Sequence, residues 1–156
     1  MCKIMVSACL AGIKCKYNGG HNFIPAIASL VKEGKAIPVC PESLGNLPIP
    51  RPPAEIENGN GYEVLEGKTR VINNQGQDVT NAFCEGAKAT LSKALKIKPK
   101  IIILKEKSPS CGSKFIYNGK FNNTIKPGQG VTTALLRKHG FKVISEKDFE
   151  RGYPLE

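Results

Sequence analysis

The feature of this sequence that most constrains its fold is an alternation of short apolar runs with longer amphipathic segments. The runs at residues 3–8, 36–40, 100–106 and 141–145 have the length and composition of buried strands. Between them lie segments whose apolar residues recur with a helical period. Strands that alternate with helices form parallel βαβ units. The sequence therefore predicts a single α/β domain over residues 1–156, a three-layer sandwich with a mainly parallel, Rossmann-like sheet.

Residues that cap or break helices place the helix boundaries. Asn22 is expected to cap a helix that begins near Pro25 and stops at Gly34. Residues 62–72 look like a hairpin, which we expect to be an accessory to the sheet. The other two helices are expected to run from a cap at Asp78 or Thr80 to Pro99, and from Gly130 to a left-handed Gly140.

One segment, residues 41–61, breaks the alternation because it shows no apolar period and is rich in proline. A long irregular segment inside a compact domain is usually functional. Its prolines lower the entropy cost of holding one shape. Because it follows Cys40 and carries Glu42 and Arg51, we expect it to wall a pocket over the strand ends. The alternative is a surface excursion with no role.

Four of the six cysteines follow predicted strands. Cys9 and Cys15 come after the first strand, Cys40 closes the second, and Cys111 stands in the loop after the third. In open α/β sheets, ligands gather outside the carboxyl ends of the strands. The four thiols are therefore expected to converge on one edge of the sheet. Convergent thiols indicate a metal or cluster site, or a redox centre.

The cysteine spacing narrows the kind of site. No CxxC pair is present, so the usual zinc-ribbon and thioredoxin patterns are absent. Thiolates can nevertheless reach one iron–sulfur cluster from separate loops. Cys9, Cys40 and Cys111 are the best-placed trio, and three ligands would leave one iron open. Cys15 is either an alternative ligand or a thiol beside the ligands.

The remaining candidate ligands are weaker. Cys2 precedes the first strand and Cys84 lies on the face of a helix, so both are expected to be structural. His21 lies in a glycine-rich loop. His139 falls in the last turn of a predicted helix, where its charge suits the helix dipole.

Charge and hydropathy restrict the partners. Twenty-three Lys and Arg against thirteen Asp and Glu give a formal net charge of +10, which favours anionic partners such as nucleic acid. The basic residues are scattered, however, which favours a solvated basic surface. No apolar stretch approaches the roughly 18 residues of a membrane span, and the first residues read as a strand rather than a signal peptide. We therefore expect a cytoplasmic protein with no membrane partner, in a compartment where thiols stay reduced.

Several short motifs carry a family resemblance. They are Ser7-Ala8-Cys9-Leu10-Ala11-Gly12, Cys15-Lys16-Tyr17-Asn18-Gly19, Cys40-Pro41-Glu42, Pro50-Arg51-Pro52, Asp78-Val79-Thr80, Leu104-Lys105, Ser108-Pro109-Ser110-Cys111-Gly112, Tyr117-Asn118-Gly119 and Gly128-Gln129-Gly130-Val131-Thr132. In combination they closely resemble the thiouracil desulfidase family of bacteria and archaea, which was long catalogued as a domain of unknown function. Its members remove sulfur from 2-thiouracil with a 4Fe-4S cluster. The resemblance covers essentially the whole chain.

The resemblance implies a cofactor and a reaction. In the desulfidases three cysteines hold the cluster and its fourth iron is free, and by motif these cysteines are Cys9, Cys40 and Cys111 here. The free iron captures the substrate sulfur while water replaces it on the ring carbon, in a non-redox desulfuration. A soft thiocarbonyl suits iron in a thiolate-bound cluster. In air the site is expected to be empty or to carry a disulfide between two of the thiols.

The resemblance also implies roles for residues beside the thiols. Glu42 would be the general acid/base, and Ser108 or Ser110 would orient the substrate or relay a proton. The alternative for Glu42 is a loop carboxylate paired with Arg51. Arg51 and Asn18 are candidate substrate-binding residues, although Asn18 stands where many relatives have an aspartate that could read a ring N–H.

Two other function classes stay open at this point. One is a nucleic-acid-linked desulfurase or binder that acts on thiolated tRNA bases, which the charge mildly supports. The other is a zinc-bound or thiol-redox protein without a cluster. The favoured partner is a small thiolated base, and nothing in the sequence points to the acceptor of the sulfur.

Overall fold

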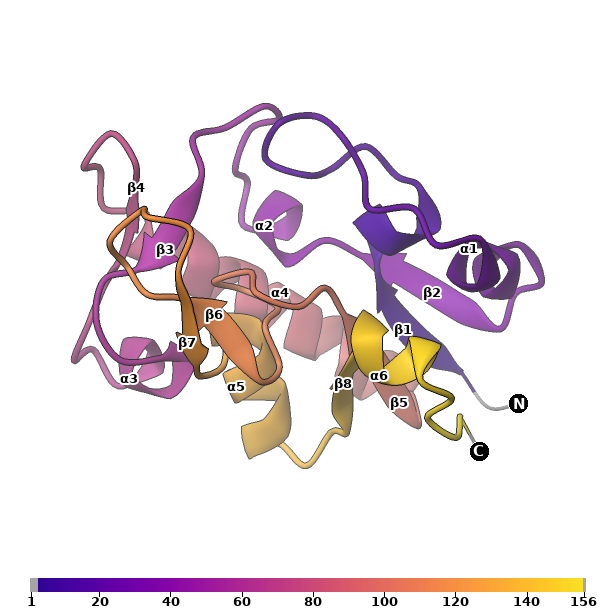
Figure 1. The fold of residues 1–156 in the computed structure, drawn as a ribbon. Coiled ribbons are helices and arrows are strands. Elements are labelled where there is room, and N and C mark those ends of the chain that lie inside the picture. The colour runs from indigo at the N-terminus through magenta and orange to yellow at the C-terminus, as the bar shows by residue number, and fades with distance from the viewer. Residues whose placement is uncertain (1–2, 156) are drawn as a thin grey trace.

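A four-stranded parallel sheet organises the molecule. The computed structural model describes residues 3–155 (Figure 1), so Cys2 lies outside the described residues. The sheet has the strand order β2-β1-β5-β8, and each neighbouring pair is parallel. The predicted parallel strands are thus confirmed, with shorter bounds. They are β1 (Ile4–Ser7), β2 (Ala36–Val39), β5 (Ile101–Leu104) and β8 (Val143–Ser145).

Helices cover both faces of the sheet, as predicted. Side chains alternate between the two faces of a strand, so Ile101 and Ile103 pack toward Ile27 on one face, whereas Ile102 and Leu104 pack toward the other. The first face is covered by α1 and α6, and the second by α4 and α5. These helices are α1 (Pro25–Lys32), α4 (Thr80–Ile97), α5 (Val131–Lys138) and α6 (Glu146–Glu150).

The predicted hairpin over residues 62–72 is wrong. Residues Gly61–Leu65 form the short helix α3, and β4 (Val71–Asn73) pairs antiparallel with β3 (Ala54–Ile56) instead. The cause is a cap, because the side-chain oxygen of Asn60 accepts hydrogen bonds from the backbone N–H groups of Tyr62 and Glu63.

A second accessory pair joins β6 (Phe115–Tyr117) to β7 (Ile125–Pro127). Both pairs lie at the side of the molecule away from α1 (Figure 1).

The segment 41–61 is more ordered than its sequence suggests. Helix α2 (Pro41–Leu44) begins directly after Cys40, with Pro41 in the first turn, where its missing N–H costs nothing. The segment also contributes β3. Asn22 does not cap α1, because Ile24 holds the cap position and makes no side-chain cap bond.

Two glycines set the distance between α2 and α4. A Cβ on Gly86 of α4 would overlap the carbonyl of Pro41, and a Cβ on Gly45 would overlap the carbonyl of Ala82. The two backbones therefore touch, which fixes the start of α2 and with it the positions of Cys40 and Glu42. Within residues 3–155, no helix has the length and apolar character needed to cross a membrane.

Candidate active site

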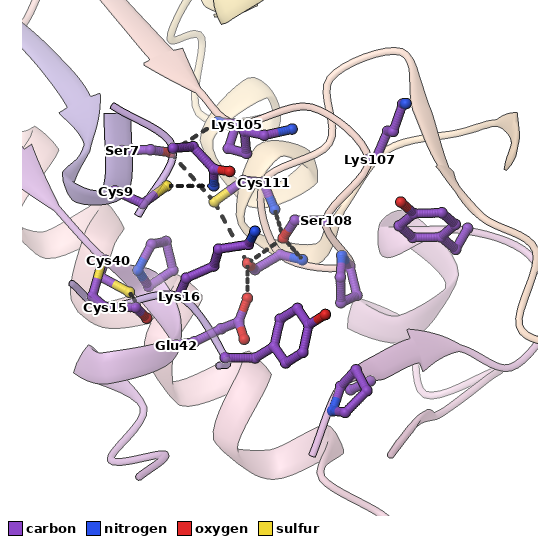
Figure 2. Close-up of a pocket in the computed structure, with 18 of the residues that line it drawn as sticks. Ser7, Cys9, Cys15, Lys16, Cys40, Glu42, Lys105, Lys107, Ser108 and Cys111 are labelled. Carbon is purple, nitrogen blue, oxygen red and sulfur yellow. Dashed lines mark hydrogen bonds between the residues drawn. The ribbon is translucent and has the colours of Figure 1, made fainter. Parts of the chain in front are cut away.

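A cavity of about 480 Å³ opens at the carboxyl ends of the central strands (Figure 2). The cavity lies over strand β1. In the sheet, β1 has β2 on one side and β5 on the other. Chain segments that leave adjacent parallel strands in opposite directions create a crevice, and open α/β proteins bind ligands there. The cavity walls come from the 3₁₀ helix η1 (Ala8–Ala11), the start of α2, residue Arg51 and the loop after β5.

All four cysteines that were expected at this edge line the cavity. Cys9 lies in η1, Cys40 directly precedes α2, and Cys15 and Cys111 come from the loops after β1 and β5. None of them is in a disulfide. Cys84 is on α4, does not line this cavity, and packs half-buried against an apolar cluster that raises the pKa of its thiol by burial.

Two of the cysteine sulfurs accept hydrogen bonds from neutral side chains. The amide nitrogen Nδ2 of Asn22 donates to Cys9 Sγ at 3.5 Å. Cys111 Sγ lies 3.8 Å from the hydroxyl of Ser7 and 3.5 Å from that of Ser110. Donors of this kind stabilise a thiolate and orient it, as the groups that surround metal ligands usually do.

The pKa of Cys15 is shifted in the opposite direction from those of Cys9 and Cys40. Hydrogen bonding to Cys40 and Cys9 raises the pKa of Cys15. The same contact with Cys15 is the main cause that lowers the pKa of Cys9, and it lowers the pKa of Cys40 to about 6. Burial raises the pKa of Cys111. The thiol of Cys15 has one proton to share between the two sulfurs, so the pKa values of the three cysteines depend on one another.

Glu42 is held from two sides in the first turn of α2. Its Oε1 accepts a hydrogen bond from Arg51 Nε at 3.0 Å, and its Oε2 accepts one from the Ser110 hydroxyl at 2.9 Å. The hydroxyls of Ser108 and Ser110 are 2.8 Å apart, which extends the chain of polar groups along the cavity wall. The ion pair between Glu42 and Arg51, which was the alternative interpretation of Glu42, is present. Glu42 also contacts Ser110, so the pairing does not withdraw its carboxylate from the cavity wall.

The structure places the two candidate substrate-binding residues differently. Arg51 is buried at the cavity wall, where its guanidinium donates to Glu42 and to the backbone carbonyls of Pro48 and Cys15. Asn18 is exposed, accepts a hydrogen bond from the backbone of Gly20, and does not line the cavity. The geometry brings Arg51 to the site and leaves Asn18 outside it.

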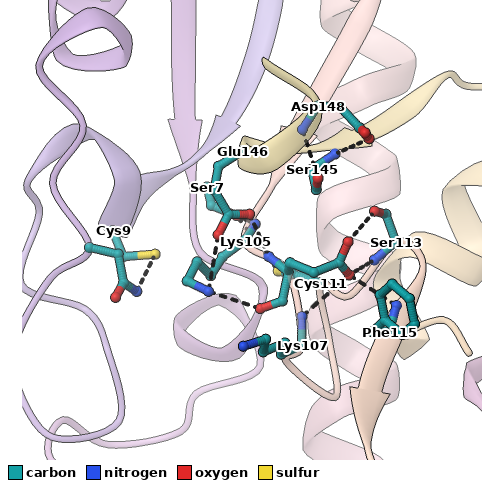
Figure 3. A network of polar contacts seen from close by, with 12 residues as sticks. Ser7, Cys9, Lys105, Lys107, Cys111, Ser113, Phe115, Ser145, Glu146 and Asp148 are labelled. Carbon is teal, nitrogen blue, oxygen red and sulfur yellow. Dashed lines mark hydrogen bonds and ion pairs between the residues drawn. The ribbon is translucent and has the colours of Figure 1, made fainter. Parts of the chain in front are cut away.

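Sequence reasoning missed several residues of the cavity wall. Lys105 follows β5, and its ammonium lies 3.0 Å from a carboxylate oxygen of Glu146 (Figure 3). The buried carboxylate of Glu106 accepts hydrogen bonds from the backbone N–H groups of Ser113, Lys114 and Phe115, and so shapes the loop that carries Cys111. The sequence signal that could have identified these residues is that two charged residues, Lys105 and Glu106, directly follow an apolar strand.

The donor set of the cavity is rich in thiols, the ligands that hold iron–sulfur clusters. Among residues 3–155, no three His, Cys, Asp or Glu side chains converge closely enough to hold one metal ion. Cysteine thiolates that come from separate loops can hold one iron–sulfur cluster. In addition, the side chain and the backbone N–H of Ser43 face the sulfur of Cys40 and help to lower the pKa of its thiol.

Comparison with known proteins agrees with this geometry. The sequence pattern of the 2-thiouracil desulfurase family matches residues 4–148. The chain belongs to this family. YbbK of Bacillus subtilis strain 168, described as an uncharacterized protein, is 50% identical over 145 residues, which are 93% of this chain and 96% of YbbK. The solved structure of TudS, described as a 4Fe-4S-dependent thiouracil desulfidase, has 42% sequence identity and a TM-score of 0.86, over 97% of this chain and 95% of TudS.

Membership of the 2-thiouracil desulfurase family confirms the resemblance that the motifs predicted. The matched residues include every cavity cysteine, Glu42 and the serines of the loop after β5. The α/β fold with its parallel sheet also agrees with the TudS structure at a TM-score of 0.86.

Proposed function

We propose that this protein removes sulfur from a thiolated pyrimidine such as 2-thiouracil, in a non-redox reaction that depends on a 4Fe-4S cluster. One observation carries the proposal. Four thiols and a fixed carboxylate line one cavity at the strand ends of a chain that is 42% identical to a 4Fe-4S-dependent thiouracil desulfidase. The enzyme would be a desulfidase of the hydrolase or lyase type.

Cys9, Cys40 and Cys111 are the proposed cluster ligands. Hydrogen bonding with Cys15 lowers the pKa of Cys9 and Cys40, and the same contacts raise the pKa of Cys15. By motif, the resemblance to the desulfidases assigns the three ligand positions to Cys9, Cys40 and Cys111, which leaves Cys15 as a neighbouring thiol. When bound through three thiolates, a cluster supplies an open iron that acts as a Lewis acid toward soft thiocarbonyl sulfur.

Glu42 is the proposed acid/base. Replacement of the ring C=S by C=O requires the attacking water to give up both of its protons, which leave with the sulfur as hydrogen sulfide, so a group beside the ring carbon has to accept and return protons. The Oε2 atom of Glu42 receives the Ser110 hydroxyl, so a proton can pass between the carboxylate and the cavity directly or through Ser110 and Ser108. Arg51 holds the other oxygen, so we propose that it acts chiefly by orienting Glu42.

The cavity suits a small planar ligand. A volume of about 480 Å³ lies in the usual range for small-molecule sites. Tyr17 and Phe121 line it and keep part of their rings exposed, so they offer apolar faces to a pyrimidine ring.

Direct binding of substrate by Arg51 or Asn18 stays a prediction, and so does a cytoplasmic location. The net charge of +10 is the observation that favours thiolated tRNA as a second substrate.

Anaerobic reconstitution tests the proposal. We expect the protein to bind iron and sulfide in cluster proportions and then to release sulfide from 2-thiouracil, with free base and thiolated nucleosides compared side by side. A variant with serine at Cys9, Cys40 and Cys111 should do neither, and Cys84→Ser should do both. Stoichiometric zinc without iron under these conditions would contradict the proposal and favour the zinc alternative.

A further inference from the structure

The hydroxyl of Ser7 is directed at one cysteine. Ser7 is the last residue of β1 and is 3% exposed. Its oxygen accepts the backbone N–H of Lys105 at 2.9 Å, which ties the ends of β1 and β5 together. Among the hydrogen bonds within residues 3–155, the Ser7 proton has one acceptor, the sulfur of Cys111 at 3.8 Å.

Ser110 does not have this single orientation, although its hydroxyl is also 3.5 Å from Cys111. A hydroxyl carries one proton, and that of Ser110 lies within reach of Glu42 at 2.9 Å and of Ser108 at 2.8 Å as well. The shorter contact with a carboxylate is the stronger one. Ser7 is therefore the dedicated donor to Cys111.

Asn22 makes the matching contact with a second cysteine of the cavity, Cys9. Its backbone N–H donates to the carbonyl of Cys9 at 2.9 Å, and its side-chain Nδ2 donates to the sulfur of the same residue at 3.5 Å. The backbone bond fixes the position of the side chain. Figure 3 shows the Cys9 sulfur with this bond, apart from the Lys105 network.

We propose that Ser7 and Asn22 are positioning residues that tune the cluster of the proposed function, on which this inference rests. Ser7 donates to the sulfur of Cys111, and Asn22 donates to that of Cys9. Hydrogen bonds to ligand sulfurs set the reduction potential of iron–sulfur clusters. They stabilise the more negative state, so these two donors raise the potential. They also withdraw electron density from the thiolates, which makes the open iron a better acceptor for substrate sulfur.

The experiment measures the reduction potential of anaerobically reconstituted protein by spectroscopic titration. Ser7→Ala and Asn22→Leu should each shift the potential to more negative values with unchanged iron content. The shifts should add in the double variant, because the two donors act on different sulfurs. Iron loss to a chelator should become about tenfold faster in each variant. Ser7→Thr keeps the hydroxyl and should restore both values.

Thr132→Val is the matched control, because Thr132 has a buried hydroxyl with no hydrogen bond within the described residues. Its potential should equal that of the wild type. Unchanged potentials in Ser7→Ala and Asn22→Leu would overturn this inference and leave the proposed function intact. Wild-type protein that takes up no iron would overturn both. If Ser7→Ala fails to fold by circular dichroism, Asn22→Leu, at a half-buried site, decides the question alone.

Discussion

Arg51 and Glu42 form an ion pair whose second carboxylate oxygen is taken by another part of the chain. Arg51 Nε lies 3.0 Å from Glu42 Oε1, and the Ser110 hydroxyl lies 2.9 Å from Oε2. The carboxylate is thus fixed between the proline-rich segment and the loop after β5. As the proposed acid/base, a carboxylate held this way would need little reorganisation when substrate binds.

Glu42→Gln should keep the cluster and lose activity. Glutamine preserves the size of the side chain and can accept the Arg51 hydrogen bond, but it cannot exchange a proton. We expect sulfide release to fall on the order of a hundredfold or more, the usual value of a positioned acid/base. Turnover assays at equal iron content measure this, with Glu85→Gln on the exposed face of α4 as the control. Full turnover with an intact cluster would assign the proton transfer to the serines.

Arg51→Met should destabilise the protein as well as the site. The change leaves Glu42 without its partner and removes two hydrogen bonds to backbone carbonyls. Loss of one partner of a largely buried pair costs about 3 kcal/mol, which urea unfolding would detect. Arg70→Met breaks the exposed pair with Glu57 and should cost below about 1 kcal/mol. Equal losses in the two variants would rule out a special role for Arg51.

Single cysteine variants separate ligands from neighbours. Serine at Cys9, Cys40 or Cys111 should abolish the visible absorption of the reconstituted protein, because a serine hydroxyl is a poor ligand for iron in a cluster. Cys15→Ser should retain it, because the proposed ligand set is Cys9, Cys40 and Cys111 and leaves Cys15 as a neighbouring thiol. Cys84→Ser, remote on α4, is the control. Loss of absorption in Cys15→Ser would make Cys15 a ligand.

Gly86→Ala should disturb the site from a distance. The added methyl overlaps the carbonyl of Pro41 and pushes α2 away from α4. Overpacking of this kind costs about 1–3 kcal/mol, and the displaced α2 carries Glu42 and follows Cys40. We expect a lower melting temperature and weaker cluster retention. Ser92→Ala, on the exposed side of the same helix, should change stability by less than about 0.5 kcal/mol.

The parallel sheet and the meeting of the thiols could be predicted because both follow from continuous apolar runs. Strand β5, Ile101–Leu104, is apolar at every position and buried on both faces. Cysteines placed after such strands must share one edge of the sheet, whatever the loops do. The pocket-forming role of residues 41–61 followed from their position after β2.

The 62–72 hairpin and the Asn22 cap were predicted wrongly because side-chain hydrogen bonds compete with the local sequence pattern at both places. Residues 62–65 alternate like a strand, yet the side chain of Asn60 captures two N–H groups and starts a helix. Asparagine is a residue type that often caps helices, but the side-chain amide of Asn22 donates a hydrogen bond to the sulfur of Cys9 instead. The donors to the sulfurs depend on contacts between distant segments, as between Ser7 and Lys105, and no local pattern encodes them.

The thiols of the cavity come from three crossovers of the sheet, and this has a consequence for assembly. Cys9 and Cys111 meet only because β5 docks beside β1, so no short stretch of the nascent chain holds the trio. Pairing between strands that are distant in the sequence forms late in folding, because the entropy cost of closing the intervening loop comes first. The proposed ligand trio is therefore complete only once β5 has paired with β1, so the unfolded chain offers no finished site.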